Sequence, residues 1–525
     1  MMNGGKGSLP DYDAVIIGTG QAGPPLAMRL AGAGMTVAIV ERGLVGGTCV
    51  NTGCTPTKTL IASAHVAHMA RRAAEYGIAI DGGISADMKR VKARKDAVVE
   101  HSRGGLTASL GQTEHCTFLK GQASFLSPRE VGVGDSVLKA ERFFINVGAR
   151  AVIPAIPGLD GVAYLTNTSL MDLDILPRHL VIIGGGYIAL EFGQMYRRFG
   201  SAVTLVERGS RLLQNEDEDV SQAVQGILEH EGIAVRTGTT CTGVAMRGDD
   251  IVVAIDGPDG EAEVSGSHLL LAVGRRPNTD DLGLDEAGVR CDEHGYITVD
   301  DQCRTNAPGI WAMGDCNGRG AFTHTAYNDF EIVAANLLDD DPRRISDRVP
   351  AYALYIDPPL GRAGMTEAEV MPTGAACAGR PAPHDACGTG RREGRDAGLH
   401  KGAGGRRHEG DPGRAHPGER RRRGDPLRAR PDACEGAVHR PSARDAHPPD
   451  GIGASADDSR RTPTSVKDQA LPSYVRPPAS SVMRWNSNWN RTGPSGATSC
   501  GTPGSTRPGV PLGSRTRSGR GSSTR

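Results

Sequence analysis

Gly46-Gly47-Thr48-Cys49-Val50-Asn51-Thr52-Gly53-Cys54-Thr55-Pro56-Thr57-Lys58 is the stretch on which the interpretation of this chain depends. Its two cysteines are separated by four residues. Thr55 is expected to cap a helix with Pro56 as its first residue, where a missing N–H leaves no hydrogen bond unmade, and helix formers continue to Glu75. Cys54 therefore lies beside the positive end of a helix, which lowers a thiol pKa and favours the thiolate, the reactive form in disulfide exchange. The alternative is a pair of buried structural cysteines or half of a metal site, but no second cysteine pair at metal-ligand spacing lies nearby.

The pattern G-G-x-C-x-x-x-x-C-x-P-x-K resembles the redox-active disulfide of the class I pyridine nucleotide-disulfide oxidoreductases. This flavoenzyme family includes dihydrolipoamide dehydrogenase, glutathione reductase and mercuric reductase. Thr55 departs from the aliphatic residue that many members carry there. The resemblance implies a Cys49–Cys54 disulfide that exchanges electrons with FAD, with Cys54 next to the flavin and Cys49 meeting the substrate. It also implies a His–Glu acid/base pair supplied by the partner subunit of a homodimer.

A strand–glycine turn–helix–strand unit precedes the cysteines. An apolar run, 14–17, leads into Gly18-Thr19-Gly20-Gln21-Ala22-Gly23, and a second apolar run, 36–40, ends at Glu41. In such a unit the first glycine permits the tight turn, the second the approach of a pyrophosphate, and the third close helix–strand packing, while the acid binds a ribose. The sequence therefore predicts a dinucleotide site at Gly18, Gly20, Gly23 and Glu41.

The same unit recurs 166 residues later, with Gly184, Gly186 and Glu207 in the corresponding places. At this single offset seven residues of the first unit have identical counterparts: Val15, Gly18, Gly20, Gly34, Val37, Glu41 and Arg42. Two dinucleotide sites in one chain indicate one flavin and one nicotinamide; the alternative is two parallel-sheet units without ligand. Glu207 favours NADH because a carboxylate repels a 2′-phosphate, whereas Arg208 and Arg211 would suit NADPH.

Other pieces match the family. The runs around Gly148 and Gly274 resemble the ends of its two nucleotide domains, and Asp315 resembles the acid that binds the FAD ribityl chain. Lys58 and Glu191 resemble its buried pair beside the flavin, Tyr187 the side chain that covers the nicotinamide pocket, and Thr48 a cofactor-binding position. Taken alone, the two charges would be ordinary solvated helix residues and Tyr187 a core aromatic.

Composition limits the setting. At 525 residues two or three domains are expected. Eleven irregularly spaced cysteines do not form a secreted disulfide framework. The beginning of the chain lacks a signal-peptide core, and no apolar run reaches membrane-spanning length. We therefore expect a cytoplasmic protein without a membrane or metal requirement. The sequence shows neither an N-terminal metal-carrier module with a Cys-x-x-Cys motif nor a cysteine pair at its end. We therefore do not expect strict mercuric reductase activity.

After Val370 the periodicity of a folded domain disappears. Lys and Arg number 33 against 47 Asp and Glu through Val370, but 27 against 14 afterwards, and only two of those 27 are lysines. When codons from His384 onward, and from Cys434 to Ala454, are read one base later with free synonymous choice, they permit a strand-patterned segment and the family's H-P-T-x-x-E motif. We interpret the tail as the product of a one-nucleotide frame change near residues 370–384. The alternative is a basic tail that binds nucleic acid.

The expected fold is α/β, with two Rossmann-like domains of the three-layer ββα FAD/NAD(P) type. The C-terminal α+β interface domain is expected to be largely missing and replaced by a disordered tail. The expected boundaries are 1–152 and 276–345 for the FAD-binding domain, 153–275 for the NAD(P)-binding domain, 346–370 for the start of the dimerisation domain, and 371–525 for the tail.

The expected activity is electron transfer between NAD(P)H, FAD and Cys49–Cys54, and on to a small-molecule disulfide or thiol-bound metal. The alternatives are a flavin- and nucleotide-binding relic without turnover, and a flavin NAD(P)H oxidase or quinone reductase. Because the lost domain forms the family's dimer and supplies its acid/base pair, the chain is expected to dimerise poorly and to lose catalysis with it.

Overall fold

The computed structural model of the protein describes residues 11–373, 382–383 and 399–400. All of these lie in the first of two units of the chain, residues 1–436. The predicted disordered tail, the frame change and the codon-shifted motif fall mainly outside the described residues and stay predictions. Within the tail the structure describes the 3₁₀ turn η6 (Met371–Thr373) and the paired strands β20 (Ala382–Pro383) and β21 (Leu399–His400), although we expected no helix or strand there.

The first sheet has the strand order β3-β2-β1-β6-β5-β4, and β17 pairs with residues 143–145 of β6, beyond the part of β6 that pairs with β5. Strands β1, β2, β3, β6 and β17 pair in parallel, whereas β4 and β5 form an antiparallel meander with β6. Its members are β1 (Tyr12–Ile17), β2 (Val37–Glu41), β3 (Cys116–Lys120), β4 (Ala123–Ser127), β5 (Glu130–Val133), β6 (Ser136–Ile145) and β17 (Ile310–Ala312). Strand β1 is apolar at nearly every position because a central parallel strand is covered on both faces.

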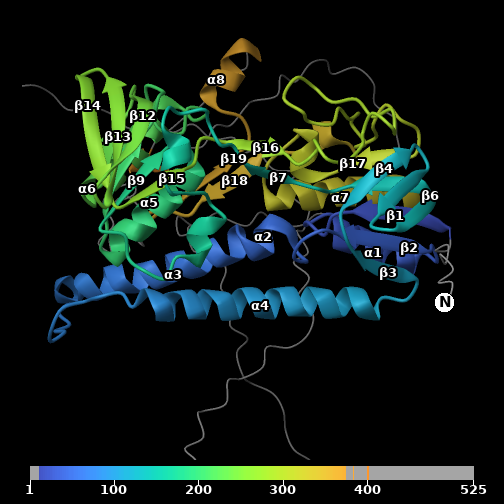
Figure 1. Ribbon diagram of the computed structural model, residues 1–525, viewed down its shortest axis with the longest axis horizontal. Coiled ribbons are helices and arrows are strands. Elements are labelled where there is room, and N and C mark those ends of the chain that lie inside the picture. Colours follow the sequence, from blue (N-terminus) through green and yellow to red (C-terminus); the bar gives the residue numbers. More distant parts are fainter. Residues whose placement is uncertain (1–10, 374–381, 384–398, 401–525) are drawn as a thin grey trace, which may run out of the picture. The chain divides into compact units, whose positions relative to one another are not determined.

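The second parallel sheet has the order β11-β10-β9-β15-β8. It consists of β8 (Tyr164–Leu165), β9 (His179–Ile183), β10 (Ala202–Val206), β11 (Ala234–Arg236) and β15 (His268–Leu271). A three-stranded antiparallel sheet lies beside it in Figure 1, made of β12 (Thr240–Arg247), β13 (Asp250–Gly257) and β14 (Gly260–Gly266). Two further strand pairs are β7 (Ala149–Ala151) with β16 (Arg275–Pro277), and β18 (Ala351–Leu354) with β19 (Leu360–Ala363). The two predicted Rossmann-like sheets are thus confirmed.

The helices connect and cover these sheets. They are α1 (Gly23–Gly32), α2 (Gly47–Asn51), α3 (Cys54–Arg71), α4 (Met88–Gln112), α5 (Tyr187–Phe199), α6 (Glu218–His230), α7 (Thr323–Leu338) and α8 (Glu367–Val370). The other 3₁₀ turns are η1 (Ala73–Tyr76), η2 (Leu159–Gly161), η3 (Ser169–Asp172), η4 (Gly314–Asn317) and η5 (Ile345–Asp347). Helices α3 and α4 run side by side (Figure 1).

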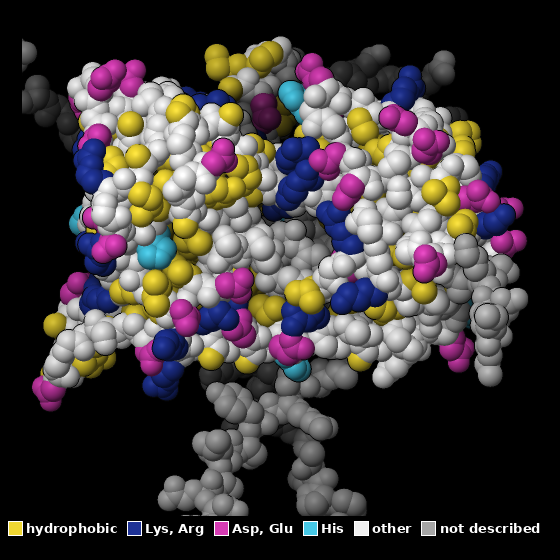
Figure 2. All heavy atoms as spheres, viewed as in Figure 1, with side chains coloured by type: hydrophobic (Ala, Val, Ile, Leu, Met, Phe, Trp, Pro, Cys, Tyr) yellow, Lys and Arg dark blue, Asp and Glu magenta, His cyan; other side chains and the backbone are white. Residues whose placement is uncertain are grey.

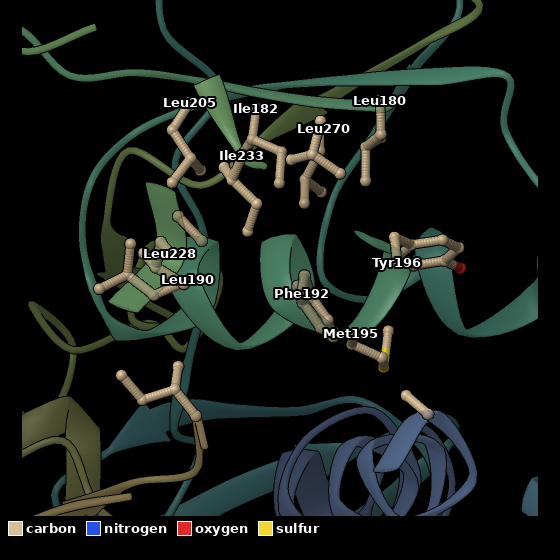
Figure 3. Packing of buried hydrophobic residues seen from close by; sticks show 14 of the residues in the cluster. Leu180, Ile182, Leu190, Phe192, Met195, Tyr196, Leu205, Leu228, Ile233 and Leu270 are labelled. Carbon is tan, nitrogen blue, oxygen red and sulfur yellow. The ribbon is translucent and has the colours of Figure 1, made fainter. Parts of the chain in front are cut away.

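Helix α5 is buried on nearly all sides because it is packed on two sides, and its buried residues include the polar side chains of Glu191, Gln194 and Arg198. Figure 3 shows Leu190, Phe192, Met195 and Tyr196 of α5 within a cluster that includes strand residues of the second sheet. Those strand residues are Leu180, Ile182, Leu205 and Leu270. Leu60 and Ala64 of α3 belong to the same cluster. Helix α5 therefore joins the second sheet to the helix that begins at Cys54.

Buried charges hold the segment around Asp357 against the second sheet. Arg198 of α5 places its guanidinium 2.5 Å from a Glu231 carboxylate oxygen and 2.9 Å from an Asp357 oxygen, and its side chain is only 5% exposed. Gln194 accepts a hydrogen bond from the Asp357 backbone N–H at 2.8 Å. A second buried acid, Glu216, accepts from the Tyr352 hydroxyl at 2.5 Å and from Arg362 at 3.1 Å. The β18–β19 hairpin is therefore fixed by contacts outside itself, which a two-stranded ribbon needs for stability.

We predict that Arg198→Ala lowers the free energy of unfolding by about 3–5 kcal/mol, because it leaves two carboxylates buried without their cation. Urea unfolding followed by far-ultraviolet circular dichroism measures this. The matched control is Arg247→Ala, which removes an arginine from an exposed pair with Glu263 and should leave the midpoint unchanged. Equal midpoints for the two variants would contradict a structural role for Arg198.

Candidate functional site

The two cysteines lie at the junction of two helices. Cys49 is in the short helix α2, and Cys54 is the first residue of α3. The N-cap is Gly53, so the prediction that Thr55 caps the helix and Pro56 begins it is wrong by two residues. A Cβ on Gly53 would lie 2.9 Å from the carbonyl oxygen of Thr48, so only a glycine fits this bend without a shift. The helix therefore starts at the sulfur-bearing residue itself.

The surroundings of the two sulfurs separate their acidities. Both cysteines are thiols in this structure, and Cys54 Sγ lies 2.9 Å from the Thr323 hydroxyl. A hydrogen bond from the Cys49 thiol lowers the pKa of Cys54 to about 6, and the Thr323 hydroxyl and the positive charge of Lys58 add to this effect against burial. The same hydrogen bond, together with burial, raises the pKa of Cys49. The hydrogen bond thus favours the thiolate on Cys54 and the thiol on Cys49.

Lys58 and Glu191 meet close to the cysteines. The Lys58 ammonium lies 2.7 Å from a carboxylate oxygen of Glu191, whose side chain is buried. Glu191 also accepts a hydrogen bond from the backbone N–H of Tyr355 at 2.9 Å, and the Lys58 Nζ lies 4.6 Å from the centre of the Tyr355 ring. Lys58 is one turn after Cys54 on α3, and Glu191 is on α5. The pair thus connects the cysteine helix to the second sheet.

The first glycine turn is held by Asn146, which follows the end of β6. Gly18 has φ +104°, and a Cβ there would lie 2.3 Å from the Asn146 carbonyl oxygen. A Cβ on Gly20 would lie 2.8 Å from Asn146 Oδ1, the atom that accepts the Gly23 backbone N–H at 3.0 Å. Glu41, at the end of β2, accepts from the backbone and hydroxyl of Thr19 at 2.9 and 2.6 Å. The acid is therefore fixed against the turn.

The second glycine turn repeats this arrangement in part. Gly184 has φ +120°, and its Cβ would lie 2.4 Å from the Ala272 carbonyl oxygen, but a Cβ on Gly186 would meet nothing within 4 Å. Glu207 Oε1 accepts from the Gly209 N–H at 2.6 Å and from Gln214 at 2.8 Å. Its other oxygen lies 2.8 Å from where a Gly185 Cβ would stand. The free carboxylate oxygen thus faces the turn.

A cavity of about 550 Å³ connects the first turn to the cysteines. Of the predicted site residues it is lined by Gly18, Gly20, Glu41, Thr48, Cys49, Cys54, Lys58, Gly148, Tyr187, Glu191 and Asp315. The predicted residues that do not line it are Gly23, Gly184, Gly186, Glu207 and Gly274. Its volume is in the range of cofactor pockets, and its wall combines a glycine turn at a helix start with reactive sulfur. These residues fit an extended dinucleotide.

Cationic side chains accompany the cavity. Arg42 and Arg275 line it, and Arg275 forms an ion pair with Asp315 at 3.0 Å. Burial raises the pKa of Asp315, against the attraction of Arg275. Figure 2 shows a hollow near the middle of the displayed face, with Lys and Arg side chains gathered around it. Positive charge at a concave site favours an anionic ligand.

Several residues of the site escaped the sequence analysis. Asn146 stands in an apolar run at a strand end, a signal that could have identified it. Arg275 lay in a matched run without an assigned role. Thr323 and Phe322 carried no signal, because the first meets Cys54 from 269 positions away and the second meets Tyr187 at a ring distance of 5.4 Å. Phe322 also stacks on Tyr352, with ring centres 5.3 Å apart.

The described residues contain neither a metal-binding cluster nor a membrane-spanning helix. No group of three or more His, Cys, Asp or Glu side chains is arranged there to hold a metal ion. Among the helices of this part of the chain, none combines the length and apolar character needed to cross a bilayer.

Known proteins resemble this arrangement. The family description "Pyridine nucleotide-disulphide oxidoreductase" matches residues 12–329. A mercuric reductase of Streptomyces lividans is 37% identical over 375 residues, covering 70% of this chain and 78% of the relative. The probable pyridine nucleotide-disulfide oxidoreductase RclA of Escherichia coli strain K12 is 36% identical, covering 69% and 79%. A dihydrolipoyl dehydrogenase of Thermus scotoductus is 35% identical, covering 70% and 79%.

Solved structures agree in fold. The HOCl-induced flavoprotein disulfide reductase RclA from Escherichia coli superposes with a TM-score of 0.68 at 34% identity, covering 75% of this chain and 86% of that one. Its Cu(II) complex gives the same values.

We predict that Lys58→Met lowers the free energy of unfolding by about 2 kcal/mol, because it leaves the buried Glu191 carboxylate without its cation while Lys58 itself is about one-third exposed. The double variant Lys58→Met/Glu191→Gln should recover most of this loss, since it removes both charges. Urea unfolding of the two single variants, the double variant and the parent forms the cycle. Additive single effects would show that the two side chains are not coupled.

Proposed function

The chain belongs to the pyridine nucleotide-disulphide oxidoreductase family, and from that premise we propose that Cys49 and Cys54 form the disulfide through which it passes electrons. Members of this family are FAD-dependent oxidoreductases that use NAD(P)H and act on sulfur groups. The observation that carries the proposal is the position of Cys54, at the start of α3 and in the cavity that also contains the Gly18–Gly20 turn. The same cavity therefore suits both a dinucleotide and a reactive sulfur.

Each sulfur has its own role in the proposal. Two electrons break the Cys49–Cys54 bond, and one proton enters with them at neutral pH. That proton resides on Cys49, whose pKa is raised, while Cys54 stays a thiolate next to the cofactor ring. Once a base removes its proton, Cys49 attacks one sulfur of a small disulfide substrate, whose S–S bond breaks and releases one thiol. Cys54 then attacks Cys49, re-forms the Cys49–Cys54 disulfide and releases the second thiol. A thiol-binding metal ion would instead be bound by the Cys49 thiolate. Lys58, held by Glu191, keeps a positive charge beside the thiolate.

The cofactor sites follow the two glycine turns. Residues 1–152 and 276–345 are proposed to bind FAD, with Gly18, Gly20, Gly23, Glu41, Thr48, Lys58, Gly148 and Asp315 as its contacts. FAD would supply the two-electron relay between the nicotinamide and the sulfur pair. Residues 153–275 are proposed to bind the nicotinamide nucleotide through Gly184, Gly186, Tyr187, Glu207 and Gly274. Residues 346–370 begin the dimerisation domain in this proposal, and the homodimer stays a prediction for this chain.

The nicotinamide nucleotide is proposed to be NADH. Glu207 Oε1 is fixed by Gly209 and Gln214, and its Oε2 faces the glycine turn, where it suits a ribose hydroxyl and repels a 2′-phosphate. Arg211 donates to the backbone carbonyls of Gln214 and Glu216, at 3.1 Å each, and its guanidinium is thereby turned to the protein.

Substituting Glu207→Gln should shift the ratio of kcat/KM for NADH over NADPH by about tenfold towards NADPH, because it removes the repelling charge but keeps the side-chain size. Steady-state rates with both nucleotides measure the ratio. Glu261→Gln, on exposed β14, is the matched control and should leave it unchanged. A parent protein that already prefers NADPH would refute the assignment.

Cys49→Ser should lower turnover with a disulfide substrate by about a thousandfold, because the hydroxyl does not replace a thiol in exchange. Turnover with a quinone, which needs no sulfur exchange, should be unchanged. The measurement is NADH oxidation with each acceptor, by the parent and the variant at equal flavin content.

Two results would replace the proposal. Disulfide turnover that survives in the variant, or a parent that reduces only a quinone or oxygen, would favour a flavin NAD(P)H oxidase or quinone reductase. A yellow parent that turns over neither acceptor would favour a binding relic.

A further inference from the structure

The first residues of two helices meet at the Cys54 sulfur. Cys54 is the first residue of α3, which has 18 residues, and Thr323 is the first residue of α7, which has 16. The Cys54 sulfur and the Thr323 hydroxyl oxygen are 2.9 Å apart. Helix N-termini carry partial positive charge that is felt within the first turn. A negative charge on Cys54 would therefore be stabilised from two sides.

We propose that Thr323 is a positioning residue for the redox pair: it donates its hydroxyl hydrogen to Cys54 and holds this sulfur as the thiolate. Because a thiolate has no hydrogen to donate, the hydroxyl must be the donor once Cys54 is ionised. Hydrogen bonds to a charged acceptor are shorter and stronger than those between neutral groups. The proposal rests on the proposed function, since it concerns the same sulfur pair in its reduced state.

The start of α7 is fixed, so that the hydroxyl is directed at the sulfur. The Phe322 backbone N–H donates to the Thr325 hydroxyl at 3.0 Å, and that hydroxyl donates to the Phe322 carbonyl at 2.6 Å. The Phe322 ring stacks on Tyr352 with an angle of 7° between the planes. The imidazole of His324 lies 2.6 Å from the Ala351 carbonyl oxygen. These contacts flank Thr323 on both sides along the chain and hold its backbone in place.

Among the described residues, both side chains and helix N-termini stabilise this thiolate. Lys58 provides the charge, Cys49 and Thr323 provide hydrogen bonds, and α3 and α7 provide their N-termini. Two electrons and one proton would convert the disulfide into a Cys54 thiolate and a Cys49 thiol. These groups hold the negative charge on Cys54, whereas the proton on Cys49 must still be taken up from solvent in this step and removed again before exchange.

The test measures the pH at which Cys54 ionises. In a Cys49→Ser background, which leaves one motif sulfur and keeps a hydroxyl donor, the full chain is treated with iodoacetamide across pH 4–10, and alkylation of Cys54 is followed by peptide mass spectrometry. Thr323→Val should move the midpoint upward by about one pH unit, because it removes a donor but keeps the side-chain shape. Thr323→Ser should restore the midpoint of the background. Thr107→Val, at an exposed position of α4 outside the cavity wall, is the matched control and should not move it.

A midpoint that is the same with valine, serine and threonine at position 323 would overturn the proposal. If the valine variant does not fold, Thr323→Ala is used in its place, with the same expected shift and the same overturning result. The outcome is separable from the proposed function: a parent chain that never forms the Cys49–Cys54 disulfide refutes that function, yet the midpoints can still be compared. A disulfide-forming parent with an unmoved midpoint refutes only the role of Thr323.

Discussion

The close approach of backbone to backbone at the two glycine turns is the constraint on which the rest of the structure depends. At Gly18 and again at Gly184 the chain passes so near the carbonyl of a neighbouring strand end that a Cβ would lie within 2.4 Å of it. Positive φ at both positions adds to this restriction. Because the turn is that tight, the following helix starts directly over the sheet, and its N-terminal N–H groups face the site of the ligand. The helix that carries Cys54 packs instead against α4 and α5.

Charge in the interior connects these parts. Glu191 joins α5 to Lys58 on the cysteine helix, and Arg198, one turn further than Gln194, reaches Asp357. A buried ion pair contributes little net stability compared with apolar packing, but removing one partner is costly. Such pairs therefore fix orientation: they set how the cysteine helix, the second sheet and the β18–β19 hairpin meet. The thiolate-stabilising groups around Cys54 lie at this junction, which explains why residues from distant parts of the chain converge there.

The sequence predicted what is encoded locally. The apolar runs that lead into the glycine turns form β1 and β9. As expected, Glu41 is the last residue of β2 and Glu207 directly follows β10. The start of α3 was misplaced because Thr and Pro are strong local signals, whereas the steric contact between Gly53 and Thr48 is visible only in three dimensions. Thr323, Phe322 and Arg275 could not be assigned because their partners lie far away in the chain. Pattern and spacing therefore identify the glycine turns and the two cysteines, but not the neighbouring residues that shift the pKa values of those cysteines.

The surroundings of the two glycine turns differ in one respect that concerns the rate at which a bound nucleotide dissociates rather than its affinity. In the first, the Asn146 side chain accepts from Gly23 and donates to the Met313 carbonyl, closing the turn on several sides. In the second, Ala272 offers only its backbone, and the space beside Gly186 is open. A preorganised binding site that is closed by hydrogen bonds releases its ligand slowly, whereas an open site exchanges its ligand readily. The same duplicated unit thus suits both a cofactor that stays bound through many catalytic cycles and a nucleotide that dissociates after each cycle.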